Sequence, residues 1–258
     1  QGGLSVPRSC ITSGTSGARR QRSREKSQVP KLAELRRELA IANRILAREQ
    51  VVDAYGHVSV RRPAAPARFL LSRSRSPELV VPGDIMEFGL DGEVVDQSDS
   101  RQPYLERFIH AAIYEARPDA ASVVHSHSPA VVPFSVTGTP LRPLIHVAGG
   151  MGATLPVWDI RGRFGDTDLL VANMEQGRDM VRALGGNAVV LMRGHGCSVA
   201  AASLKQAVIT AVYLQLNATL QLKAMQLGEV TYLSEGEVRK THELVDMPCV
   251  MIRVWDYL

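Results

Sequence analysis

The sequence is poor in cysteine, in aromatic residues and in long apolar segments. Its three cysteines, Cys10, Cys197 and Cys249, show no disulfide or zinc-ribbon spacing, which favours a reducing compartment such as the cytoplasm. No apolar run approaches the roughly 20 residues that cross a bilayer, so no membrane partner is expected. Phe, Trp and Tyr make up only 5% of the residues, whereas Ala, Val and Leu are abundant. This composition is typical of helix-rich α/β or α+β proteins.

Excess basic charge is confined to the N-terminal segment. The formal net charge is +4, but residues 1–31 hold seven Lys or Arg against one Glu, a charge of +6, so residues 32–258 carry −2. The body is therefore not predicted to bind nucleic acid. Residues 1–30 lack apolar periodicity and are predicted to be a disordered basic tail, serving as a targeting peptide or arm, or else a non-native extension. Residues 31–258 are predicted to form one domain.

Apolar periodicity predicts alternating helices and strands in residues 31–258. Predicted helices span residues 31–48, 103–116, 173–184 and 204–227. Predicted strands lie at residues 57–61, 69–72, 79–81, 85–88, 123–127 and 189–195, the second to fourth forming a small meander. The tail, residues 249–257, is predicted to be a final strand or an arm onto a neighbouring copy.

Two histidines, His125 and His127, end an apolar run that begins at Val123. Residues i and i+2 of a strand face the same side, so both imidazoles would project together, as two ligands of one metal do. Such a pair also occurs by chance, with no metal role. A second apolar run leads to His195, which stands between two glycines that let the backbone approach closely. Together the three histidines favour a metal site.

Four further candidates each allow an ordinary structural explanation. Glu106, near the start of helix 103–116, either suits the helix dipole or serves as an acid/base or ligand carboxylate. His57 at a turn is either exposed or functional, and His146 at a strand end is either a core or a functional residue. One loop is either a solvated basic surface or a match for carboxylate or phosphate oxygens. It consists of Ser72, Arg73, Ser74 and Arg75.

Several of these motifs, in this order, resemble the class II aldolase/adducin family over about residues 32–230. They are Asp53-Ala54-Tyr55-Gly56-His57-Val58-Ser59-Val60-Arg61, Glu106, Ala116-Arg117-Pro118-Asp119 leading to His125-Ser126-His127, Phe164-Gly165 and Gly194-His195-Gly196. The resemblance implies a three-layer α/β/α fold around a mainly antiparallel sheet, and a homotetramer with active sites between subunits. It also implies one divalent metal ion per subunit, Zn, Mn, Fe or Co, on His125, His127 and His195.

The same resemblance implies roles for other residues. Glu106 matches the family's acid/base carboxylate, which can also touch the metal. His146 falls where aldolases place a tyrosine that reaches into a neighbouring site. The turns that hold phosphate in sugar-phosphate members are replaced by Gly56-His57, the 72–75 loop and Tyr104-Leu105. Several charge-assisted hydrogen bonds, each worth about 1.5–3 kcal/mol, would be lost, which disfavours a phosphosugar.

Within the family the motifs are most similar to the decarboxylase-like branch, whose members act on hydroxylated aromatic or pyridine dicarboxylates or carboxylated muconic semialdehydes. This implies a carbon–carbon lyase, a metal-dependent decarboxylase of aromatic catabolism acting on a small anionic substrate. In that scheme His57 orients the substrate hydroxyl, Glu106 or His146 returns a proton, and Arg73 or Arg75 binds a second carboxylate. The other expected substrate-binding residues are Gly56, Ser72 and Ser74. Alternatives are a class II aldolase or epimerase on a small carbonyl, an iron-dependent oxygenase of the same fold, or a non-enzymatic adducin-like scaffold.

Overall fold

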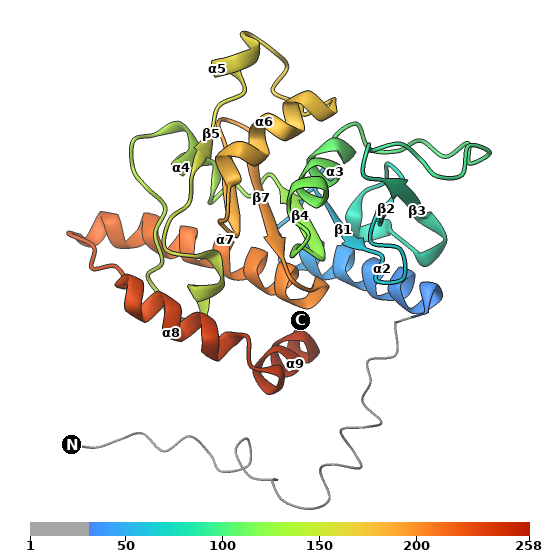
Figure 1. The fold of residues 1–258 in the computed structure, drawn as a ribbon. Coiled ribbons are helices and arrows are strands. Elements are labelled where there is room, and N and C mark those ends of the chain that lie inside the picture. The colour runs from blue at the N-terminus through green and yellow to red at the C-terminus, as the bar shows by residue number, and fades with distance from the viewer. Residues whose placement is uncertain (1–30) are drawn as a thin grey trace, which may run out of the picture.

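A computed structural model describes residues 31–258, which fold as three layers around a seven-stranded sheet (Figure 1). The strand order is β3-β2-β1-β4-β7-β6-β5. Every neighbouring pair is antiparallel except β5 with β6. The predicted three-layer α/β fold with a mainly antiparallel sheet is confirmed. The predictions for residues 1–30 lie outside the described residues.

The strands are β1 (His57–Arg61), β2 (Arg68–Ser72), β3 (Ile85–Gly89), β4 (Ser122–Ser126), β5 (Val157–Trp158), β6 (Val189–Met192) and β7 (Gly196–Ala201). The α-helices are α2 (Leu32–Arg48), α3 (Arg107–Ala116), α4 (Val132–Val136), α5 (Arg161–Phe164), α6 (Met174–Leu184), α7 (Leu204–Leu227), α8 (Glu235–Val245) and α9 (Pro248–Tyr257). Three 3₁₀ turns are η2 (Pro77–Leu79), η3 (Pro82–Asp84) and η4 (His146–Met151).

The sheet separates two hydrophobic cores. Helices α2 and α7 cover one face, and α3 and α6 cover the other (Figure 1). Strand β4 shows the alternation that this requires, because Val123 packs in the α3/α6 core and Val124 in the α2/α7 core. Both faces of the central strands are therefore apolar, which is why their sequences are nearly continuous hydrophobic runs.

Several predicted boundaries are wrong. Helix α3 begins at Arg107 rather than at residue 103, because Pro103 forms a β-bridge with Arg73. Residues 79–81 are not a strand, since two prolines start 3₁₀ turns there. The tail is helix α9, which begins with Pro248 at its first turn, and not a strand. The alternative of an arm onto a neighbouring copy stays a prediction. Strand β7 and helix α8 were not predicted from the sequence.

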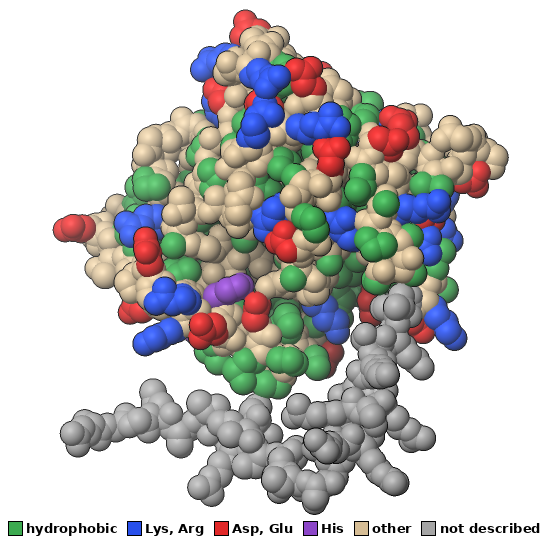
Figure 2. Space-filling view, viewed as in Figure 1, with side chains coloured by type: hydrophobic (Ala, Val, Ile, Leu, Met, Phe, Trp, Pro, Cys, Tyr) green, Lys and Arg blue, Asp and Glu red, His purple; other side chains and the backbone are tan. Residues whose placement is uncertain are grey.

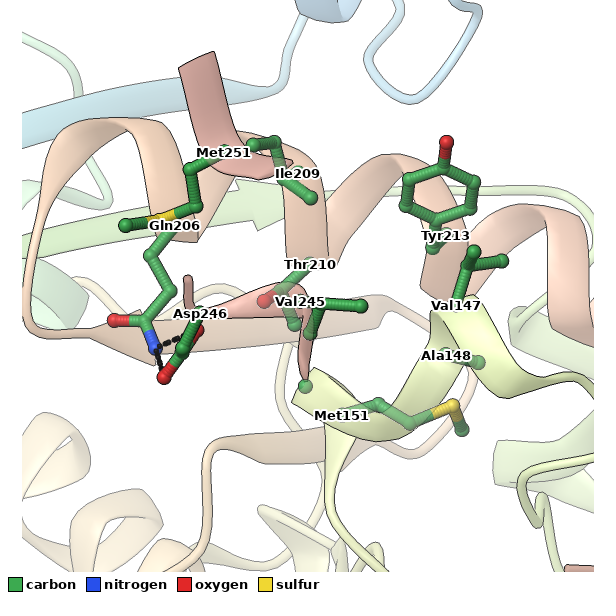
Figure 3. A pocket seen from close by; sticks show the side chains of 11 residues that line it. Val147, Ala148, Met151, Gln206, Ile209, Thr210, Tyr213, Val245, Asp246 and Met251 are labelled. Carbon is green, nitrogen blue, oxygen red and sulfur yellow. Dashed lines mark hydrogen bonds between the residues drawn. The ribbon is translucent and has the colours of Figure 1, made fainter. Parts of the chain in front are cut away.

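The last two helices close one end of the molecule. Helix α8 packs against η4, and Gln206 of α7 donates from Nε2 to both carboxylate oxygens of Asp246 at 2.9 Å (Figure 3). A space of only about 10 Å³, about the size of one water, lies beside this contact. A cleft of about 460 Å³ opens among η4, α7 and α8 and is lined by Gly150, Gln206 and His242.

On the face shown in Figure 2, Lys and Arg side chains are interspersed with Asp and Glu, and apolar side chains gather over α9. Ile252 and Tyr257 of α9 are 51% and 74% exposed. Within residues 31–258, no helix combines the length and apolar character that a membrane crossing requires.

Candidate functional site

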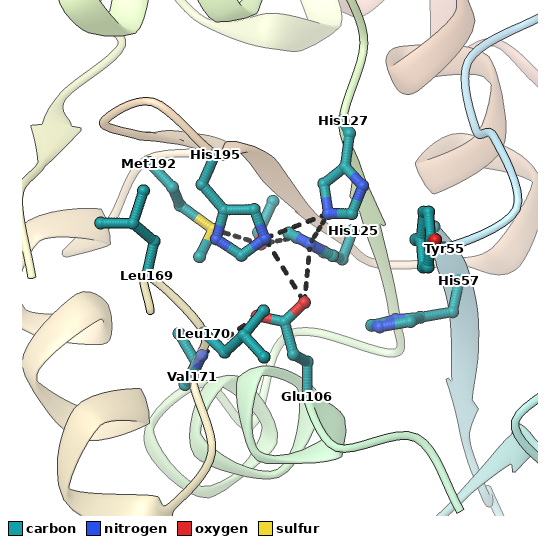
Figure 4. A network of polar contacts seen from close by, with 12 residues as sticks. Tyr55, His57, Glu106, His125, His127, Leu169, Leu170, Val171, Met192 and His195 are labelled. Atoms are coloured by element: carbon teal, nitrogen blue, oxygen red, sulfur yellow. Dashed lines mark hydrogen bonds and ion pairs between the residues drawn. The ribbon is translucent and has the colours of Figure 1, made fainter. Parts of the chain in front are cut away.

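Three histidines meet where two neighbouring strands end. His125 lies within β4, His127 directly follows it, and His195 occupies the turn between β6 and β7 (Figure 4). Strands β4 and β7 pair in the register Ser126 to Cys197, which brings the turn beside the end of β4. The approach is so close that a Cβ on Gly196 would lie 2.1 Å from the carbonyl oxygen of Ser126. Only glycine allows this pairing.

The ring nitrogens of these histidines converge with a carboxylate. His127 Nε2 lies 3.0 Å from His125 Nε2 and 3.0 Å from His195 Nε2. Glu106 Oε2 is 3.5 Å from His125 Nε2 and 3.4 Å from His195 Nε2. The four candidate ligand atoms all lie within 4.8 Å of one another. Sequence reasoning named all four residues, and the structure brings them together.

This donor set fits a metal ion. A single proton on His127 Nε2 satisfies only one of its two nitrogen neighbours, whereas a cation between the nitrogens suits all of them. The opposite nitrogens have partners typical of ligand histidines: His125 Nδ1 lies 3.3 Å from Ser198 Oγ, and His127 Nδ1 lies 3.6 Å from Asp53 Oδ1. His195 Nδ1 is buried without a partner among the described residues. Imidazole and carboxylate ligands suit Zn, Mn, Fe or Co alike.

Glu106 is the N-cap residue of α3, not a first-turn residue, and its side chain is buried. Its Oε1 accepts a hydrogen bond from the backbone N–H of Val171 at 3.0 Å. Burial by itself raises the pKa of Glu106, but the charges and hydrogen bonds of His125 and His195 outweigh it and hold the pKa well below its ordinary value. The carboxylate is therefore ionised. The pKa of His127 is lowered to about 4 by burial and by the neighbouring histidines.

A cleft of about 680 Å³ opens beside the cluster. Six of the residues predicted to be functional line it: His57, Ser74, Arg75, Glu106, His127 and His195. His125, Gly56, Ser72 and Arg73 do not line it, and His125 and Ser72 are fully buried. Gly56 instead packs against Val52, where a Cβ would be 2.6 Å from Cγ1. The structure thus divides the predicted binding residues into cleft-lining and supporting ones.

Residues 168–170 form a wall of the cleft that sequence reasoning missed. The cleft is lined there by Asp168, Leu169 and Leu170. They lie next to Val171, whose backbone N–H donates a hydrogen bond to Glu106 (Figure 4). Leu169 has a φ of 68°, which is uncommon for a residue with a side chain. The strained backbone was not readable from the sequence, and the nearest signal was Phe164-Gly165 upstream.

Both arginines of the 72–75 loop bind one buried carboxylate. Arg73 Nε lies 2.7 Å from Asp84 Oδ1, and Arg75 Nη1 lies 3.0 Å from Asp84 Oδ2. Burial raises the pKa of Asp84, but the hydrogen bonds from Arg73, Val81 and Arg75 outweigh it and lower the pKa. Two cations and one anion leave a single net positive charge, which Arg75 presents to the cleft. The Tyr104 hydroxyl, also in the cleft, donates to the carbonyl oxygen of Arg75.

His57 is not an exposed turn residue, since only 1% of it is accessible. Its Nδ1 lies 2.7 Å from Nε2 of His110, a fully buried histidine of α3 that sequence reasoning missed. Burial and the neighbouring histidines lower the pKa of His57. Burial also lowers the pKa of His110 to about 3. The spacing of His110 and Tyr114, four residues apart on one helix, was the available signal.

His146 does not join this site within one chain. It is the first residue of η4, is exposed and does not line the cleft. A role in a neighbouring copy's site therefore stays a prediction.

Comparisons with known proteins agree with this geometry. The family described as Class II Aldolase and Adducin N-terminal domain matches residues 37–222. The decarboxylase tropJ of Talaromyces stipitatus is 34% identical over 234 residues, which cover 82% of this chain and 87% of the relative. The 3,4-dihydroxyphthalate decarboxylase of Arthrobacter keyseri is 32% identical over 207 residues, covering 75% and 79%. An aldolase II superfamily protein from Pseudomonas syringae has the same fold, with a TM-score of 0.72, 22% identity and coverage of 91% and 97%.

Proposed function

Because the chain belongs to the class II aldolase and adducin family, with decarboxylases among its relatives, we propose that it is a metal-dependent carboxy-lyase. The proposed substrate is a hydroxylated aromatic or heteroaromatic dicarboxylate, or a related enol-carboxylate. The observation that carries the proposal is the convergence of His125, His127, His195 and Glu106 beside a cleft that also presents Arg75.

The histidine cluster supports the bond-breaking step. When bound there, a divalent ion would supply Lewis acidity for the negative charge that develops on a substrate oxygen as the carbon–carbon bond breaks. His57 lines the same cleft, which supports its proposed contact with a substrate hydroxyl. Decarboxylation and aldol cleavage share this demand, so the cluster alone does not choose between them.

Arg75 supports a carboxylate as the substrate's second anchor. A guanidinium matches a carboxylate with two parallel hydrogen bonds. Because Asp84 already neutralises one of the two loop arginines, the loop offers one net charge, which suits a carboxylate better than a phosphate dianion. This argues for a hydroxy-dicarboxylate over a phosphosugar.

Glu106 supports the proton balance of the reaction. The ionised carboxylate takes the proton of the substrate hydroxyl as the substrate binds. Glu106 then returns the proton to the ring carbon that bears the carboxylate, and the substrate oxygen becomes a carbonyl oxygen. As the carbon–carbon bond breaks and carbon dioxide leaves, the electron pair of that bond passes through the ring to this oxygen, which restores the aromatic ring and leaves a phenolate. His146 of a neighbouring copy is the alternative donor if the protein assembles as the proposed homotetramer.

Carbon dioxide release from a panel of dihydroxybenzoates and dihydroxyphthalates tests the proposal. We expect release from at least one dicarboxylate, dependence on metal content by elemental analysis, and loss after chelation. The second candidate, an aldolase or epimerase, is favoured by the fold and by the same cluster. Cleavage of a small hydroxy-carbonyl compound with no carbon dioxide from the panel would select it, and metal-free protein inactive on both panels would select an adducin-like scaffold.

Mixing inactive variants tests the intersubunit role of His146. If His146 serves a neighbouring site, co-refolded His125→Ala and His146→Ala chains should recover part of the activity, because some sites then receive both intact residues. Each variant refolded alone is the control, and sedimentation gives the oligomeric state. No recovery in a confirmed oligomer would remove His146 from the scheme.

A further inference from the structure

We infer that Ser59 and His110 are positioning residues that hold His57 as its Nε2–H tautomer, so that His57 donates a hydrogen bond into the cleft. The direction of these hydrogen bonds follows from the buried, hydrogen-bonded side chains alone. Its use on a substrate oxygen rests on the proposed function.

The four side chains form one continuous hydrogen-bonded chain. His57 Nδ1 lies 2.7 Å from His110 Nε2, His110 Nδ1 lies 2.6 Å from Ser59 Oγ, and Ser59 Oγ lies 2.7 Å from the Tyr114 hydroxyl. His57 and Ser59 share one face of β1, and His110 and Tyr114 share one face of α3, so the two elements align all four groups. His110 and Ser59 have no accessible surface, and His57 and Tyr114 have 1% each.

Both imidazoles of the chain are neutral. The hydrogen-bond partners of the two rings are each other and, for His110, the Ser59 hydroxyl, none of which is an anion. A buried cation without an anionic partner is strongly disfavoured. Each ring therefore carries one proton, and each contact of the chain holds one proton.

Only one direction of the chain uses every proton. If Tyr114 donates to Ser59, Ser59 donates to His110 Nδ1 and His110 Nε2–H donates to His57 Nδ1, all the hydrogens between these groups are bonded. His57 then carries its own proton on Nε2. That atom has no partner among residues 31–258, and the ring lines the cleft (Figure 4).

The two other directions each leave a buried donor unbonded. In the reversed chain the Tyr114 proton lacks an acceptor, because the other hydrogen-bond partner of the hydroxyl in the described part of the protein is the backbone N–H of Val123, which is a donor. If His110 Nδ1–H and Tyr114 both donate to Ser59, the proton of the Ser59 hydroxyl lacks an acceptor. An unbonded buried donor costs about 1–3 kcal/mol. Because only the direction in which Ser59 donates to His110 bonds every proton, the Ser59 hydroxyl decides which nitrogen of His57 holds the proton.

A fixed donor suits an oxygen that becomes more negative during the reaction. The His57 ring lies 5.1 Å from the His125 ring, centroid to centroid, and 4.5 Å from the Tyr104 ring. A substrate oxygen beside the histidine cluster is therefore within its reach. His57 acts as a donor in this assignment and not as a base.

Nitrogen-15 NMR of histidine-labelled, zinc-loaded protein tests the direction without any substrate. The Nδ1 and Nε2 shifts of His57 and His110, assigned by their loss in His57→Gln and His110→Gln, should show protonated Nε2 and bare Nδ1 on both rings. In His110→Leu, which removes the donor to His57 Nδ1, the His57 shifts should move toward a mixture of tautomers, whereas in Tyr114→Phe they should stay as they are because Ser59 still donates to His110. An Nδ1–H tautomer of His57 in the unsubstituted protein overturns the inference whether or not the protein is a decarboxylase.

Kinetics tests the use of the donor. Ser59→Ala should lower kcat about two- to tenfold with KM changed by less than about twofold, because His110 Nδ1 loses its donor and only the molecules that keep the Nε2–H tautomer of His57 turn over at the full rate. Tyr114→Phe should keep kcat within about twofold, because Ser59 still donates to His110. Ser122→Ala is the matched control, since Ser122 is equally buried on the adjacent strand but donates to the backbone oxygen of Ser59. It should keep its kcat.

A conservative variant separates positioning from packing. The side chain of His110→Gln carries an N–H that can replace the donor to His57, so it should retain at least a third of kcat, whereas His110→Leu should lose about tenfold or more. Equal losses in the two variants, or in Ser59→Ala and Ser122→Ala, would show that these residues act only by filling the core. If no substrate of the panel reacts, the proposed function fails and the NMR result still decides the tautomer.

Discussion

The two polar groups of the cleft differ in how far the protein itself satisfies them. In the histidine cluster, His127 Nε2 faces two other ring nitrogens at 3.0 Å, an arrangement that one proton cannot satisfy. In the 72–75 loop, by contrast, Asp84 already binds Arg73 and Arg75. The histidine cluster therefore needs a bound cation to satisfy its nitrogens. In the loop, Asp84 already neutralises one arginine, and one positive charge remains. The histidine cluster is thus suited to bind a metal ion, and the 72–75 loop is suited to bind one negatively charged group of a substrate.

The largest effect is expected from His125→Ala, which removes one candidate metal ligand from the histidine cluster. We expect loss of bound metal and a fall in kcat/KM of more than about 1,000-fold, while the fold is largely retained. Metal analysis, circular dichroism and turnover measure this. His242→Ala, with a half-exposed side chain at another end of the molecule, is the control. An active, metal-free His125→Ala protein would contradict both the proposed metal site and the contrast drawn between the histidine cluster and the 72–75 loop.

The next effect is expected from Glu106→Gln, which keeps the volume but removes the charge beside the histidines. As an acid/base, Glu106 supplies about 100- to 10,000-fold in kcat, and the variant should keep its metal. As a ligand, its loss should lower metal content as well. Metal stoichiometry with kcat therefore separates the two roles, and unchanged kcat at full metal occupancy would exclude both.

A smaller effect is expected from Arg75→Ala in the 72–75 loop, where Asp84 already binds both arginines. Loss of a charge-assisted hydrogen bond of about 1.5–3 kcal/mol should reduce kcat/KM about 10- to 100-fold, mostly through KM, with metal content unchanged. Arg73→Ala is the matched variant, because Arg73 also binds Asp84 but does not line the cleft. Equal KM effects of the two substitutions would show that the loop acts by charge alone.

The smallest effect on turnover, but a measurable one on stability, is expected from Asp84→Asn. Unpairing two arginines should lower the free energy of unfolding by about 1–3 kcal/mol. Since folding depresses the pKa of Asp84, its stabilisation is complete above the unfolded pKa of about 3.9 and is lost as pH falls through the lower folded value. The stability difference between Asp84→Asn and the unsubstituted chain should shrink over that acidic range. A constant difference would contradict the shift.

Asp84→Asn also sharpens the comparison, because it leaves the loop with two uncompensated charges. We expect inorganic phosphate to inhibit the variant more strongly than the unsubstituted protein, at constant ionic strength. Equal inhibition would mean that Asp84 does not set the charge preference of the cleft.

The sequence by itself determined the features that one element or one short segment controls. The i, i+2 spacing fixed the common direction of His125 and His127, and the apolar run before His195 fixed its place at a strand end. The resemblance then added Glu106 and the fold. These were readable because periodicity along a single strand or helix decides which way its side chains point.

The tertiary structure decided which elements meet. His57 and His110 are 53 residues apart, and Arg73 and Asp84 are 11 residues apart, so no local pattern reveals that each pair is bonded. The start of α3 and the wall at residues 168–170 were likewise set by contacts with distant segments. Packing of the two cores against the sheet fixes these distances and registers, and it thereby decides which of the polar side chains are completed by partners and which remain open to a ligand.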